Sequence, residues 1–234
     1  MADGKDAKTA IVDAMMTLAA TRRFEDIAIR DIAAAAGVSL ADYRDAFPSK
    51  GAVLAAFSRR IDRAVLSTPL GDLATSPARD RLFDVLMRRL DAMAPYRLAL
   101  REISGWLRRD PAALVELNRL TVNSMRFMME AAEIDSDGPT GALKLQGLSL
   151  AWARVFAVWI DDTPPDFSKT MAALDRELSR GERMVERVDS LDRLAQPFKA
   201  LARAALETRR RAKESFRHKR RRRDGDEDAR EHRL

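Results

Sequence analysis

The sequence of 234 residues predicts an all-α protein. Alanine, leucine and arginine dominate it, whereas aromatic residues make up only 6%, and such a composition favours helix. Apolar residues recur every three or four positions in several long segments, and no long segment alternates apolar with polar residues. We expect a small helical domain over residues 1–66 and a larger one over residues 78–207.

The small domain should begin with an amphipathic helix over residues 6–23, whose apolar side chains share one face. Two short helices are expected over residues 30–36 and 40–47. Gly37 lies between them and can adopt a positive φ angle. Two short helices around a tight glycine turn are typical of a helix-turn-helix module.

Capping residues mark the starts of the third and fourth helices. Ser39 and Asp42 have the spacing of a capping box, in which each side chain satisfies a backbone amide of the other. Pro48 ends the third helix, and Ser49 can cap a fourth that continues to residue 66. This fourth helix should join the two domains.

A Gly-, Pro- and Ser-containing linker over residues 67–77 separates the domains. Prolines at or near several helix starts help to divide the larger domain. Its helices are predicted over residues 78–93, 95–109, 111–132, 140–160 and 165–179, with a last one from 182 to 205 that Pro197 should kink. Residues 208–234 are expected to be a charged, disordered tail.

The segment IRDIAAAAGVSLADYRDAFPSKGAVL, residues 29–54, resembles the DNA-binding motif of TetR-type regulators. The matching positions are Ile32, Ala33, Ala36, Gly37, Val38, Ser39, Phe47, Ser49 and Lys50. The resemblance implies a homodimer whose two third helices enter successive major grooves of an operator. It also implies that the C-terminal domain binds a small apolar effector, and that the chain acts as a transcriptional repressor in the cytoplasm.

The resemblance places eight residues at the DNA: Arg30, Ser39, Leu40, Ala41, Asp42, Tyr43, Arg44 and Lys50. Arg44 stands where the family commonly has a phosphate-binding tyrosine, and it can also read a guanine edge. Asp42 and Asp45 repel phosphates, although Asp42 can serve the cap and either residue can accept from a cytosine amine. Lys50 beside a helix N-terminus is either a phosphate clamp or a solvated surface lysine.

A second resemblance covers residues 143–178, which are similar to the closing helices of TetR proteins and of TetR-fold ubiquinone-biosynthesis accessory proteins. The accessory proteins bind isoprenoid lipid and do not bind DNA. A lipid-binding role without specific DNA binding is therefore the alternative to a regulator.

The net charge of +6 lies entirely in the tail. Residues 1–207 contain 30 basic and 30 acidic side chains, whereas residues 208–234 contain 12 and 6. The basic run in the tail can attract the DNA backbone or an anionic membrane surface weakly and without sequence preference. It can equally be a solubilising end.

Methionine and aromatic side chains make adaptable apolar linings for ligands, although each also suits an ordinary core. The candidates for an effector pocket are Phe83, Met87, Leu100, Trp106, Leu117, Met125, Met128, Met129 and Trp152. The candidates for a dimer interface on the last helices are Phe156, Trp159, Phe167, Met171, Leu174 and Leu178.

The sequence argues against an enzyme. It has no cysteine, and its two histidines, His218 and His232, both lie in the tail, so a histidine-based catalytic or zinc site in a folded cleft is not expected. No glycine-rich phosphate loop is present, and we expect no cofactor or metal. No segment has eighteen consecutive apolar residues, so a membrane-spanning helix is not expected either.

Overall fold

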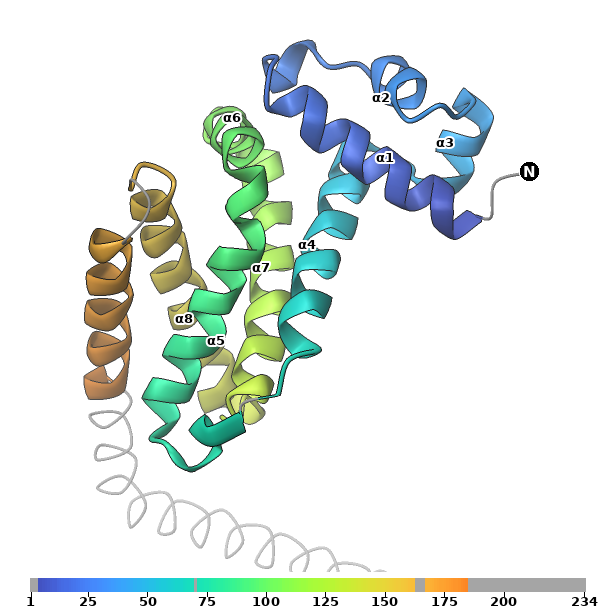
Figure 1. Cartoon of the computed structure of the whole chain (residues 1–234). Helices are drawn as coiled ribbons and strands as arrows, with labels where there is room; N and C mark the ends of the chain where they lie inside the picture. The colour runs from blue at the N-terminus through green and yellow to red at the C-terminus, as the bar shows by residue number, and fades with distance from the viewer. Residues whose placement is uncertain (1–3, 70, 163–166, 185–234) are drawn as a thin grey trace, which may run out of the picture. The chain divides into compact units, whose positions relative to one another are not determined.

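The computed structural model of the chain describes residues 4–69, 71–162 and 167–184 (Figure 1). Every regular element in these residues is helical, and the predicted all-α class is confirmed. The described residues up to Glu182 form one compact unit. The predicted tail and most of the predicted last helix lie outside the described residues.

The N-terminal part consists of α1 (Gly4–Ala19), the short 3-10 helix η1 (Phe24–Asp26), α2 (Ile29–Ala35), α3 (Leu40–Ala46) and α4 (Lys50–Leu66). The first helix ends four residues before its predicted end. The chain leaves it early because Phe24 turns inward and is fully buried. In Figure 1, α4 runs from the module of α1–α3 into the larger helical body.

The larger body consists of η2 (Gly71–Thr75), α5 (Ala78–Met93), η3 (Ala94–Tyr96), α6 (Arg97–Leu107), α7 (Pro111–Ala131), α8 (Gly138–Trp159) and a helix over residues 168–184. The helix predicted over residues 95–109 is preceded by a separate 3-10 turn. Pro95 lies within that turn, where its missing amide costs no helical hydrogen bond. One continuous apolar core includes side chains from every helix from α1 to α8.

Candidate functional site

The turn between α2 and α3 depends on Gly37. Its φ angle is +66°, in the left-handed region that favours glycine. The amide of Val38 donates to the carbonyl of Ala33 at 3.0 Å, and the amide of Gly37 donates to that of Ala34 at 3.1 Å. This is the Schellman arrangement that ends a helix and redirects the chain. The glycine therefore sets the angle at which α3 leaves α2.

The predicted capping box at the start of α3 is confirmed. Ser39 Oγ accepts from the Asp42 amide at 3.0 Å, and the Asp42 carboxylate accepts from the amide and hydroxyl of Ser39 at 3.2 and 2.7 Å. These hydrogen bonds from Ser39 lower the pKa of Asp42. The carboxylate is thus engaged in the cap, which favours the structural role for Asp42 over base reading.

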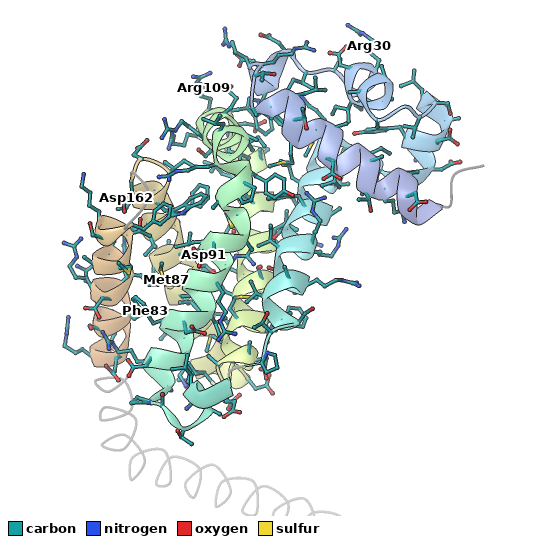
Figure 2. The ribbon with its side chains drawn as sticks, in the orientation of Figure 1. Arg30, Phe83, Met87, Asp91, Arg109 and Asp162 are labelled. Carbon is teal, nitrogen blue, oxygen red and sulfur yellow. The ribbon has the colours of Figure 1, made fainter. Side chains whose placement is uncertain are left out.

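One face of the α2–α3 unit is open to solvent. Leu40 is 57% exposed, and Ala41, Arg44 and Asp45 are also exposed. The side chain of Arg44 forms no hydrogen bond or ion pair with any other residue that the structure describes. The Arg30 side chain is 80% exposed and projects from the outer side of α2 in Figure 2. The α2–α3 unit therefore exposes two arginines, Arg30 on α2 and Arg44 on α3.

Tyr43 does not belong to this face, and its predicted contact with DNA is corrected. The residue is only 2% exposed, because positions 43 and 47 lie one turn apart on the inward side of α3. Its hydroxyl is buried without a hydrogen-bond partner among the described residues, and burial raises its pKa. Tyr43 anchors α3 to the core of the module.

Lys50 also differs from the prediction. Its ammonium group donates to the carbonyl oxygens of Phe24 at 3.0 Å and Ile27 at 2.8 Å, and it lies 4.5 Å from the centre of the Phe24 ring. Partial burial lowers its pKa. Two of its three donors are therefore occupied inside the module, so Lys50 ties the start of α4 to η1 and is neither a free phosphate clamp nor a solvated lysine.

The same short turn contacts α6. Glu102 accepts a hydrogen bond from the Phe24 amide at 3.2 Å, and the rings of Phe24 and Trp106 lie 5.0 Å apart. Arg109, labelled in Figure 2, approaches Glu25 at 3.7 Å. Trp106, predicted to line a pocket, thus packs against the helix-turn-helix module. A displacement of α6 would therefore displace η1 as well and, through Lys50, the start of α4.

Most of the other pocket candidates lie in the core of the larger body. The buried ones are Leu100, Met125, Met128, Met129 and Trp152, and the half-buried ones are Phe83 and Met87. Leu117 is 37% exposed in the N-terminal half of α7, so the structure does not place it in a pocket. Phe83 lines an open cleft of about 760 Å³ together with Met171, and none of the other candidates lines that cleft.

Sequence reasoning missed a buried charged cluster in the centre of this body. Arg89 and Asp62 are 5% and 8% exposed and form a close ion pair between α5 and α4. Ser124 Oγ donates to Asp62 at 2.5 Å. The signal was present, because position 89 falls on the apolar stripe that contains Leu86 and Met93, where an arginine is unusual.

The predicted dimer interface is corrected in part. Trp159, Leu174 and Leu178 are 1%, 1% and 7% exposed within a single chain. They are buried because α8 and the helix of residues 168–184 bring them into the core of the chain, where Arg97 also covers the ring of Trp159. Phe156 and Phe167 are half-buried, and Met171 remains 39% exposed.

α8 instead leaves a different face exposed. Leu143 and Leu150 are 59% and 51% exposed, and Gly147, Ala153 and Ala157 are exposed along the same side of the helix. Among the described helices, none is both long and apolar enough to cross a membrane. Within the same residues, no group of three or more acidic, histidine or cysteine side chains is arranged to hold a metal ion.

Comparison with known proteins shows similarity in structure. No protein-family model matches the chain, and no curated protein matches its sequence. A TetR transcriptional regulator from Nitrosomonas europaea superposes with a TM-score of 0.60 and 25% identity, over 75% of this chain and 97% of that one. A TetR transcriptional regulator from a Rhodococcus species superposes with a TM-score of 0.54 and 18% identity, over 76% and 96%. The chain therefore has the fold of TetR regulators.

Proposed function

We propose that this chain, which has the TetR-regulator fold, binds operator DNA through α3 and acts as a transcriptional repressor controlled by a small apolar effector. The observation that carries the proposal is the open face of α3, a capped helix from which Arg44 extends without a partner among the described residues. An unpaired arginine on a short helix suits a phosphate or a guanine edge. Such a regulator would work in the cytoplasm.

DNA affinity must come from few cations, because residues 1–66 contain 10 basic and 9 acidic side chains. Arg44 and Arg30 are the exposed cations on the α2–α3 unit, whereas Lys50 is engaged internally. Asp42 is engaged in the cap, which reduces its repulsion of phosphates, and Asp45 is left as an acceptor suited to a cytosine amine.

A homodimer would place two copies of α3 on one operator. Helix-turn-helix dimers bind half-sites about one helical turn of DNA apart. The exposed small and apolar residues of α8, from Leu143 to Ala157, form a surface on which a second copy can pack closely. Leu150→Arg should convert the dimer to a monomer in sedimentation equilibrium, while Glu116→Arg on the exposed part of α7 should leave it dimeric. A dimer that survives Leu150→Arg would refute this interface.

A mobility-shift titration with DNA from upstream of the chain's own gene tests the proposal, with nonspecific competitor at about 0.15 M salt. A discrete complex is expected, and Arg44→Ala should form it only at a markedly higher protein concentration. The matched control is Arg59→Ala, because Arg59 is exposed on α4 away from α3. Smearing that fades with salt would overturn operator binding and favour the lipid-binding alternative.

A further inference from the structure

The strongest unassigned feature is the polar cluster inside the larger body. It joins three helices: Asp62 on α4, Arg89 on α5 and Ser124 on α7. The Arg89 guanidinium pairs with Asp62 through one terminal nitrogen and donates to Ser58 Oγ at 3.3 Å through the other. Burying charges costs free energy unless they are fully paired, so a charged cluster in the core needs an explanation.

One nitrogen of the Arg89 guanidinium has no partner in this cluster. Arg89 Nε is buried and has no hydrogen-bond partner among the described residues. An arginine presents five N–H donors in a fixed plane, and a buried donor without an acceptor is unfavourable. Nε is therefore the guanidinium nitrogen that can donate to a further acceptor.

The charge of the cluster limits what that acceptor can be. Burial lowers the pKa of Arg89 to about 10, so the guanidinium still carries its charge at neutral pH, and Asp62 balances it. An added carboxylate would place a second negative charge in the core, and an added amine would meet the guanidinium. A neutral acceptor, such as a ketone or ester carbonyl, satisfies Nε without changing the net charge.

The side chains around Arg89 determine the polarity of the rest of the ligand. The guanidinium carbon lies 5.3 Å from the centre of the Trp152 ring. Ser124, which donates to Asp62, is followed on α7 by the buried Met125 and, one turn further, by the buried Met128. Thioether side chains are unbranched and repack easily, so they can make room for an apolar body.

We infer that Arg89 is the polar anchor of the effector site and that the effector is an uncharged apolar molecule with a carbonyl acceptor. This inference rests on the proposed function and specifies its ligand class. The anchor's partner Asp62 belongs to α4, the helix that Lys50 ties to the helix-turn-helix module. A ligand that repositions Arg89 therefore acts directly on the helix that carries the module.

The test compares three probes of similar size: acetophenone, its hydrocarbon counterpart ethylbenzene, and benzoate. Calorimetric titration of the full chain should give acetophenone an affinity roughly tenfold above either control, the contribution expected of about one hydrogen bond. Methyl NMR signals of Met125 and Met128 should shift with acetophenone. Equal affinities, tighter binding of benzoate, or no acetophenone binding up to its solubility would overturn the inference.

Variants distinguish a ligand held by Arg89 from one that binds only to the apolar core. Arg89→Lys keeps a charge opposite Asp62 but removes Nε, and the double variant Asp62→Leu/Arg89→Met removes the donor without leaving a buried charge. Both should lose the preference for acetophenone over ethylbenzene. Arg88→Met should keep it, because Arg88 pairs with Asp84 on its own helix. A preference that persists in the double variant would overturn the inference.

These titrations need no DNA, so they fail or succeed independently of operator binding. Loss of the operator complex with retained acetophenone selectivity would refute the proposed regulator and leave the ligand site standing. The opposite result would leave a DNA-binding protein whose effector is of another class.

Discussion

The two ends of α4 contain charged side chains that are stabilised in different ways. Near its start, Lys50 is half-buried and donates to two neutral backbone carbonyls, and no acidic side chain of the described residues pairs with it. Further along, Asp62 is buried and pairs with Arg89. The difference follows from solvent exposure. A half-exposed ammonium group keeps part of its hydration, whereas a buried carboxylate needs an opposite charge beside it. The module end is therefore tied by hydrogen bonds, and the body end by charge pairing.

The largest expected effect is at the buried end. Asp62→Ala or Arg89→Ala alone leaves one charge buried without its partner and should lower the free energy of unfolding by about 3–5 kcal/mol. Asp62→Leu/Arg89→Met, which removes both charges, should unfold at a urea concentration equal to or higher than that of wild type. A double variant as unstable as the single ones would mean that the cluster stabilises through more than charge balance.

A smaller loss is expected at the module end. Lys50→Met removes the donor to the Ile27 carbonyl and one of the two donors to the Phe24 carbonyl, which keeps the Ile27 amide, and should lower the free energy of unfolding in urea by about 1–3 kcal/mol. Lys8→Met on the exposed surface of α1 is the matched control and should change little. Equal stability of both variants would show that the ties to η1 contribute nothing.

Ser39→Ala should lower the free energy of unfolding by about 1 kcal/mol at neutral pH, because it removes the cap of α3. The pKa of Asp42 is lower in the folded chain than in the unfolded one, so its contribution is present above the unfolded pKa and is lost as the pH falls through the folded one. The effect of the substitution should therefore shrink below about pH 4.

Ser49→Ala is the control for this pH dependence. Ser49 caps α4 by accepting from the Ala52 amide at 3.2 Å, and no acidic residue lies in the first turn of that helix. Ser49→Ala should therefore lower the free energy of unfolding by a similar amount at neutral and at acidic pH. A pH dependence as large as that of Ser39→Ala would contradict the assignment to Asp42.

The smallest effect is expected for a charge on the surface of α4. Arg60 pairs with Asp13 at 2.5 Å in a partly exposed position. Arg60→Met keeps most of the packing and should change the free energy of unfolding by less than about 1 kcal/mol. A loss as large as that of Lys50→Met would show that exposure does not distinguish the charges of α4.

Local signals predicted much of the fold. The capping box of Ser39 and Asp42, the turn at Gly37 and the bounds of α5 follow from residues close together in the sequence, and the structure agrees with them. The first helix was predicted too long because the position of η1, and with it the turn after Ala19, depends on partners far along the chain, such as Trp106, which packs against Phe24.

The candidate site was less predictable for the same reason. The partners of Lys50 are carbonyls of a turn more than twenty residues earlier, and no motif indicates them. The inward position of Tyr43 could have been read from its spacing to Phe47, and Arg89 from its place on an apolar stripe. Which face of α8 remains exposed depends on how the last helices pack, which periodicity alone does not determine.

The salt dependence of operator binding tests the central claim most directly. The binding constant for upstream DNA should be measured against salt concentration for wild type, Arg44→Ala and Lys50→Met. If Arg44 contacts a phosphate and Lys50 does not, Arg44→Ala should reduce the slope of log K against log salt by about 1, whereas Lys50→Met should weaken binding with the slope unchanged. An equal loss of slope for Lys50→Met, or no specific complex with wild type, would contradict this account.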